Sequence, residues 1–202
     1  MAFNYDKFSA LILDWDGVFT DGKKSQDGST SFSEIDLMGL NLLRFGYFLR
    51  TKKMLRVAIV TGERNTTAEY VAQREHFDVF LYHCRNKLNA IQLFNDHWGT
   101  TPDEWMFVFD DVLDFGLASK VGFRAMVARS QAEHTLNYAQ GNSLVDLELP
   151  PEGSIRYLAE TLLVDANQFH DVLAQRSSWS KPYLEYWKSR NNKELLIVDN
   201  AI

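Results

Sequence analysis

Acidic side chains lie at the ends of two separate apolar segments of this sequence, residues 8–15 and residues 105–109. Several carboxylates brought to one point repel each other strongly unless a cation joins them. A hard cation that prefers oxygen ligands and retains some of its water is Mg²⁺. The two segments therefore predict a magnesium site, provided that their ends lie together. The carboxylates concerned are those of Asp14, Asp16, Asp110, Asp111 and Asp114.

A hydroxyl group and an ammonium group follow two further segments. Thr61 and Gly62 come directly after residues 55–60, and Lys87 begins the stretch that follows residues 79–82. A magnesium ion beside a lysine and a Thr-Gly turn suits a phosphate group. The first amides of a helix after Thr61 and Gly62 would face that anion. Together these groups predict the chemistry of a phosphoryl group.

Two of the carboxylates have the spacing for covalent catalysis. Asp14 could attack phosphorus and form an acyl-phosphate. Asp16, two residues on, would lie on the same side of a strand, protonate the leaving oxygen and later accept a proton from water. Each group alone has an ordinary interpretation, since aspartates cap helices, Thr-Gly forms turns and most lysines are solvated. Their joint occurrence at the ends of separate segments favours a catalytic site.

The segments that must position these groups are of two alternating kinds. Short apolar runs are expected to be buried strands, and the stretches between them are expected to be helices. Such alternation predicts a Rossmann-like α/β fold, a parallel sheet with helices on both faces that binds ligands beyond the carboxyl ends of its strands. The expected strands cover residues 8–15, 55–60, 79–82, 105–109 and 123–127. The expected helices cover residues 36–50, 66–75, 86–98, 112–120, 154–164, 167–175 and 182–190.

Two stretches fall outside this alternation. Asp27 and Gly28, between short polar arms, predict a β-hairpin over residues 25–32. At the other end of the chain, we expect residues 1–175 to form the core and residues 176–202 to form a C-terminal helical extension, whose last residues the pattern does not place.

Composition excludes several classes of protein. The 202 residues are 46% hydrophobic and 24% charged, with a net charge of −6, which suits one globular domain and offers no basic face to a nucleic acid. The single cysteine, Cys84, favours a reducing compartment. No apolar run approaches the roughly 18 residues of a membrane span, and the first residues lack the features of a signal peptide. We therefore expect a cytoplasmic protein that binds neither nucleic acid nor membrane.

The motifs resemble those of the haloacid dehalogenase superfamily. Residues 14–20 (DWDGVFT) resemble its first motif, DxDGxxT, and Thr61 resembles the second. Lys87 resembles the third motif, and residues 110–114 (DDVLD) resemble the fourth. The resemblance implies a haloacid dehalogenase-like α/β fold and a Mg²⁺ cofactor.

The resemblance also implies a role for each matching residue. Asp14 would be the nucleophile and Asp16 the general acid and base, which separates a phosphatase from a dehalogenase. The metal site would comprise Asp14, the backbone carbonyl of Asp16, Asp110 and Asp111, with Asp114 ordering it. The phosphoryl group would bind at Asp14, Gly17, Thr61, Gly62 and Lys87. The gaps between the first three motifs are too short for a cap domain, so a capless member is expected.

A closer resemblance concerns the substrate. Residues 11–22, 32–43, 57–62 and 151–153 are similar to the 3-deoxy-D-manno-octulosonate 8-phosphate phosphatases and to the 2-keto-3-deoxynonulosonate 9-phosphate phosphatases. Glu63 follows the second motif as in the nonulosonate branch, where the octulosonate branch usually has arginine; a surface glutamate without substrate contact is the alternative. Further candidates for substrate contact are Asp36 and Glu152, the latter with a helix cap as its alternative.

This chain departs from the closer family at three positions. Ile35 and Leu37 replace the arginine and glycine of its Arg-Asp-Gly stretch, and Phe109 replaces the glycine before the paired aspartates. The family implies a homotetramer in which the hairpin of a neighbouring chain shields each site. The sequence thus predicts an Mg²⁺-dependent phosphomonoesterase acting on a small sugar-acid phosphate. The alternatives are a weak or inactive regulatory member of the fold and a phosphomutase, which would have to exclude water.

Overall fold

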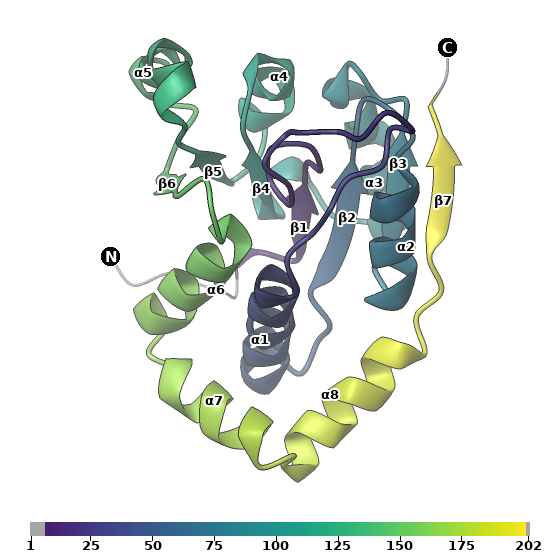
Figure 1. Ribbon diagram of the computed structural model, residues 1–202. Helices are drawn as coiled ribbons and strands as arrows, with labels where there is room; N and C mark the ends of the chain where they lie inside the picture. Colours follow the sequence, from purple (N-terminus) through teal and green to yellow (C-terminus); the bar gives the residue numbers. More distant parts are fainter. Residues whose placement is uncertain (1–6, 201–202) are drawn as a thin grey trace.

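The computed structural model describes residues 7–200, and their strands form one sheet with the order β6-β5-β4-β1-β2-β3-β7 (Figure 1). All six pairs of neighbouring strands are parallel. The α/β class predicted from the alternation of segments is confirmed. The strands are β1 (Ala10–Leu13), β2 (Arg56–Val60), β3 (Val79–Tyr82), β4 (Trp105–Phe109), β5 (Phe123–Val127), β6 (Leu147–Leu149) and β7 (Leu196–Asp199).

Helices cover both faces of this sheet and divide the core into two apolar layers. On β1, Leu11 and Leu13 face one layer, whereas Ala10 and Ile12 face the other, as the alternation of side chains in a strand requires. The first layer is covered by α1 (Glu34–Thr51), α2 (Thr66–Arg74), α6 (Ser154–Asp165), α7 (Phe169–Ser177) and α8 (Lys181–Asn191). The second is covered by α3 (Ala90–Trp98), α4 (Phe115–Ala118) and α5 (Glu133–Gly141).

The sheet order brings together the segments that carry the predicted site residues. β1 lies between β2 and β4, and Leu13 is in register with Ile59 on one side and Val108 on the other. Because these strands are parallel, the residues that follow them emerge at the same edge of the sheet. The expected convergence of the strand ends is therefore confirmed. No second domain is inserted between β1 and β2, as expected for a capless chain.

The predicted hairpin over residues 25–32 forms its turn but not its strands. The N–H of Gly28 donates to the carbonyl of Ser25, and the N–H of Ser25 donates to the carbonyl of Ser29. No strand is assigned in this stretch. Most residues of its arms are polar, so pairing the arms would bury little apolar surface.

The C-terminal extension is not helical throughout. Helix α7 crosses the expected boundary at residue 175, α8 follows it, and β7 then pairs with the outer edge of β3. The added strand covers backbone groups that an open edge would leave unpaired. Tyr183 and Tyr186 of α8 are buried against the core, where Tyr183 meets Phe45 edge to face at 5.0 Å.

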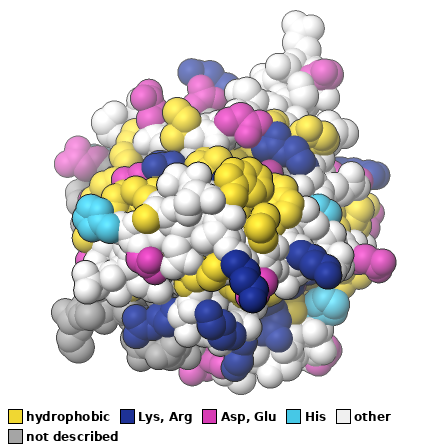
Figure 2. Space-filling view, turned by 90° about the horizontal axis from the view of Figure 1, so that it is seen from below, with side chains coloured by type: hydrophobic (Ala, Val, Ile, Leu, Met, Phe, Trp, Pro, Cys, Tyr) yellow, Lys and Arg dark blue, Asp and Glu magenta, His cyan; other side chains and the backbone are white. Residues whose placement is uncertain are grey.

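Other apolar groups of this region remain at the surface. Trp179 and Leu184 are each about half exposed. Figure 2 shows the lower face of the molecule, on which apolar side chains lie among lysines and arginines. Across residues 7–200, no helix combines the length and the hydropathy that crossing a membrane requires. The first six residues, on which the prediction of no signal peptide depends, and the last two of the extension lie outside the described residues.

Candidate active site

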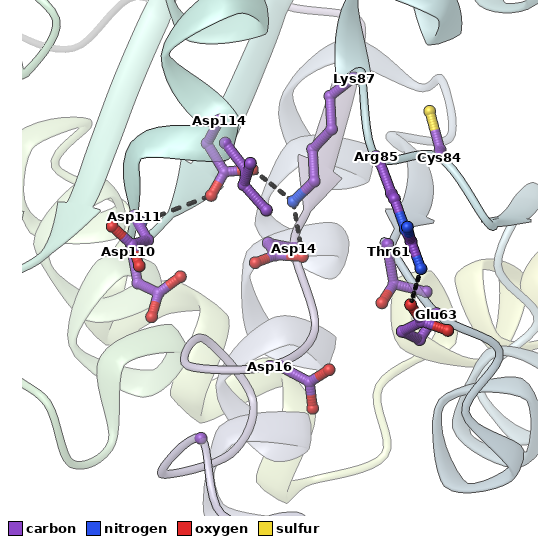
Figure 3. Close-up of a pocket in the computed structure, with 13 residues that line it drawn as sticks. Asp14, Asp16, Thr61, Glu63, Cys84, Arg85, Lys87, Asp110, Asp111 and Asp114 are labelled. Carbon is purple, nitrogen blue, oxygen red and sulfur yellow. Dashed lines mark hydrogen bonds and ion pairs between the residues drawn. The ribbon is translucent and has the colours of Figure 1, made fainter.

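A cavity of about 360 Å³ opens at the carboxyl ends of the central strands. Its side chains come from the segments after β1, β2, β3 and β4, and Figure 3 shows Lys87 reaching both Asp14 and Asp114 among them. Nine of the residues predicted from the motifs and the substrate analysis line it. They are Asp14, Asp16, Thr61, Gly62, Glu63, Lys87, Asp110, Asp111 and Asp114.

Lys87 joins two buried carboxylates at the floor of the cavity. Its Nζ lies 2.6 Å from Asp14 Oδ1 and also contacts Asp114 Oδ1. The lysine begins a short 3₁₀ turn, Lys87–Asn89, which the side chain of Asn86 caps by accepting the N–H of Leu88. Burial alone would lower the pKa of Lys87, but Asp14 and Asp114 outweigh it and raise that pKa. Lys87 is therefore a fixed positive charge beside Asp14.

Three carboxylates form an acidic cluster around this point. Asp14, Asp110 and Asp114 each place one oxygen within 4.8 Å of the other two. Burial, together with the charges of Asp14 and Asp114, raises the pKa of Asp110 to about 7. Burial and the charge of Asp14 likewise raise the pKa of Asp114 to about 7, although Lys87 opposes them, and burial raises the pKa of Asp14. The cluster has more negative than positive charge at close range, and its hard oxygen donors fit a divalent cation.

The cluster contains Asp114, which was expected to order the metal site, and not Asp111, which was expected to belong to it. Asp111 lines the cavity, but its side chain caps the 3₁₀ turn Val112–Asp114 by accepting the N–H of Val112 at 2.7 Å. Its own N–H faces Asp114 Oδ2 at 3.4 Å. This turn brings Asp114 back over Asp14, which the order of the residues alone does not reveal.

The loop after β1 carries Asp16 and Gly17, which have different neighbours. Asp16 forms an ion pair with Lys24 at 2.7 Å, and its Oδ1 is buried without a hydrogen-bond partner among residues 7–200. Gly17 has φ +90°, and a Cβ built on it would lie 1.8 Å from Asp110 Oδ2. Only glycine fits this close approach. Gly17 itself does not line the cavity, although it was predicted to contact phosphate.

Thr61 and Gly62 line the cavity. The helix after them, α2, does not leave all of its first N–H groups free to bind a phosphate there. Thr61 is buried at the end of β2, and its carbonyl accepts the N–H of Cys84. Asn65 caps α2, and its side chain accepts the N–H groups of Thr67 and Ala68 at 3.0 and 3.2 Å. The expectation that this helix start faces a phosphate is wrong for those two amides, because a neighbouring side chain already satisfies them.

Two of the three candidates for substrate contact lie elsewhere. Asp36 is buried on α1, where its Oδ1 accepts the N–H of Arg156 at 2.8 Å and burial raises its pKa. It caps the start of α6 rather than reaching the cavity at the strand ends. Glu152 is exposed and, like Asp36, borders a separate hollow. Glu63 does line the cavity and pairs with Arg85 at 2.7 Å.

The three departures from the closer family leave the cavity open. Phe109 points into the second core layer, where it stacks on Phe107 at 5.3 Å and meets Phe115 edge to face at 6.2 Å. Leu37 is buried in the first layer, and Ile35 is exposed on α1. None of these side chains lines the cavity at the strand ends.

Three basic residues at the site escaped the sequence analysis. Lys24 reaches Asp16 from the loop after β1, and Arg85 comes from the end of β3. Arg129 donates from Nη2 to the carbonyls of Gly17 at 2.6 Å and of Thr20 at 3.3 Å. Its position two residues beyond β5 was the available signal, because that strand ends at the same edge of the sheet. The thiol of Cys84 also lines the cavity, and burial raises its pKa to about 11, which keeps it protonated.

Comparison with known proteins supports the same architecture. No protein-family model matches the chain, and no curated protein matches it in sequence. A solved structure assigned to the HAD superfamily (subfamily III A) hydrolases, from Legionella pneumophila, is similar with a TM-score of 0.67 at 24% identity, covering 90% of this chain and 92% of the other.

Two further similar structures are 3-deoxy-D-manno-octulosonate 8-phosphate phosphatases. That from Moraxella catarrhalis, in complex with magnesium ion, phosphate ion and KDO, has a TM-score of 0.66 at 20% identity, covering 85% of this chain and 96% of the other. The cobalt-bound form from Haemophilus influenzae has a TM-score of 0.64 at 20% identity, and the match covers 82% of this chain and 92% of the other. The resemblance inferred from the motifs is thus confirmed at the level of architecture. This chain has the fold of the HAD superfamily hydrolases, without a cap domain.

Proposed function

We propose that this protein is a Mg²⁺-dependent phosphomonoesterase that hydrolyses a small sugar-acid phosphate through an aspartyl-phosphate on Asp14. The observation that carries the proposal is the cluster of Asp14, Asp110 and Asp114, in which Lys87 joins Asp14 to Asp114, at the floor of an open cavity. A divalent cation held by this cluster would supply positive charge against the oxygens of the phosphoryl group. The 8-phosphate phosphatases among the similar structures support the class of substrate.

In the first step, an oxygen of the Asp14 carboxylate attacks phosphorus, and the bond from phosphorus to the ester oxygen breaks. Asp16 donates a proton to the departing oxygen, so an alcohol leaves. Lys87 orients the attacking carboxylate through its 2.6 Å contact and opposes the rise in the pKa of Asp14 that burial causes. Thr61 and Gly62, at the wall of the cavity, contact the phosphoryl oxygens.

In the second step, water attacks phosphorus and gives up a proton to Asp16. The bond from phosphorus to Asp14 then breaks, which releases inorganic phosphate and restores both carboxyl groups to their starting states. The open cavity admits water, which favours hydrolysis over transfer to a second sugar, as a phosphomutase would require. A reducing, cytoplasmic location and a homotetramer remain part of the proposal.

Turnover of p-nitrophenyl phosphate tests the activity. We expect release of phosphate with MgCl₂, its loss with EDTA, and a fall of at least about 10³-fold in Asp14→Asn with the fold retained. Asp21→Asn is the matched control, because Asp21 lies in the same loop but lines a different hollow. An active Asp14→Asn variant would contradict the covalent mechanism, and a wild-type protein without turnover would favour the regulatory alternative. Transfer of the phosphoryl group to an added sugar, instead of its release as inorganic phosphate, would favour a mutase.

A further inference from the structure

A second hollow, of about 460 Å³, adjoins the catalytic cavity. Gly62, Glu63 and Arg85 line both spaces and therefore form their common wall. Side-chain amides dominate the remainder of the second space, which we call the amide hollow. Amides offer both donors and acceptors and suit the hydroxyl groups of a polyol. The other residues of the amide hollow are His83, Asn86, Asn89 and Asn200.

Arg85 spans the common wall from the end of β3 to the end of β2. Its aliphatic part passes over Gly62, where an added Cβ would meet Cγ at 3.9 Å. Its Nη2 donates to Glu63 Oε1 at 2.7 Å, and the side chains of the two residues are 78% and 55% exposed. So exposed an ion pair is weak. A carboxylate of a ligand could replace that of Glu63 at the same guanidinium, since both accept the same hydrogen bond.

His83 and the C-terminal strand shape the far side of the amide hollow. His83 has φ +55°, a left-handed conformation that is unfavourable for a residue with a side chain. Its Nδ1 lies 2.8 Å from Asp199 Oδ1 of β7, and its ring packs edge to face on Tyr82 at 4.8 Å. The N–H of Asn200 donates to the carbonyl of Tyr82. The tail of the chain thus holds a strained residue in place at the edge of this space.

We propose that the amide hollow holds the hydroxyl-bearing end of the substrate and that Arg85 binds the substrate carboxylate in exchange for Glu63. The inference rests on the proposed phosphatase activity of the adjoining cavity. Asp14 and Lys87 would then bind the phosphate end of the substrate. Arg85, on the common wall, would bind its carboxylate. The class of substrate is a polyhydroxylated carboxylic acid with one phosphate ester, and Arg85 sets the preference for an acid over a neutral polyol.

The test compares two phosphate esters, one that carries a carboxylate and one that does not. The full-length protein with MgCl₂ is assayed for kcat/KM on 6-phosphogluconate and on glucitol 6-phosphate, which carries CH₂OH in place of the carboxylate. We expect Arg85→Gln to lower the ratio of acid to neutral kcat/KM by about tenfold. Arg64→Gln is the matched control and should leave the ratio within about twofold. Arg64 directly follows Glu63 in the chain, pairs with Glu69 at 3.0 Å and lines neither space.

An unchanged ratio in Arg85→Gln would overturn the proposal if p-nitrophenyl phosphate is still hydrolysed. If the wild-type protein hydrolyses no phosphate ester, the proposed activity fails, and calorimetry with D-gluconate then decides the subsite on its own. Weaker binding of gluconate to Arg85→Gln than to the wild type supports the subsite. Equal binding to both, or binding to neither, overturns it.

Discussion

The guanidinium of Arg129 donates to the carbonyl of Gly17 at 2.6 Å, while its Nε lies 3.9 Å from Asp110 Oδ2. One side chain from the end of β5 thus connects the loop that carries the proposed nucleophile to the acidic cluster. Gly17 in turn leaves no room for a Cβ beside the same Asp110 oxygen. The two contacts fix the loop from both sides.

Replacement of Arg129 should therefore impair the reaction without removing any proposed reacting group. We expect Arg129→Gln to lower kcat for p-nitrophenyl phosphate by about tenfold or more and to cost about 1–3 kcal/mol of unfolding free energy, because charged hydrogen bonds to buried carbonyls are lost. Arg129→Lys should recover only part of the activity, since an ammonium does not reproduce the planar fork of a guanidinium. Steady-state kinetics and urea unfolding measure both effects; full activity in the lysine variant would contradict the geometric role.

Gly17→Ala should be far more damaging than Gly28→Ala. Both glycines have positive φ, +90° and +80°, so both variants pay the backbone strain of an alanine there. Only at Gly17 does the new Cβ collide with Asp110, whereas Gly28 has open space around it. We expect at least about a tenfold larger loss of activity in Gly17→Ala. Equal losses in the two variants would show that strain alone matters.

Removal of Lys87 should destabilise the protein as well as abolish turnover. Its loss leaves Asp14 and Asp114 buried without their cation, which typically costs about 3–5 kcal/mol. Lys87→Met should therefore unfold at lower urea concentration than the wild type. The double variant Lys87→Met with Asp114→Asn should regain part of that stability, because one of the stranded charges is gone. A double variant less stable than the single one would refute this account of the cluster.

The stability that the folded protein gains from Mg²⁺ should depend on pH. The pKa of Asp110 and of Asp114 is about 7 in the metal-free fold and near 3.8 when the chain is unfolded. The folded state therefore binds more protons between these values, and the associated stability is present below about pH 4 and lost as pH rises through 7. A bound cation offsets the negative charges that Asp110 and Asp114 acquire when they lose their protons.

Melting temperatures with and without MgCl₂ measure this effect. We expect a small shift at pH 5.5 and a larger stabilising shift at pH 8. Asp110→Asn should flatten the dependence on pH, because it removes one of the two titrating carboxyls. The same magnesium shift at both pH values in the wild type would contradict the prediction.

The sequence alone determined the class of fold and most of the floor of the site. Apolar runs of four to eight residues predict buried strands, and in a parallel sheet the direction of each strand decides at which edge its following residues lie. This is why Asp14, Thr61, Lys87 and Asp110 were brought together as expected. Such reasoning uses only local pattern and chain direction, and both are written in the sequence.

Only the tertiary structure decided which groups meet within that edge. A single 3₁₀ turn puts Asp114 rather than Asp111 beside Asp14, and Asn65 takes amides that an anion was expected to use. Asp36 is used to cap a distant helix, and the final residues form a strand because β3 has an edge to pair. Each of these outcomes depends on side-chain reach and on contacts between segments far apart in the chain. A pattern of spacing along one chain does not contain those distances.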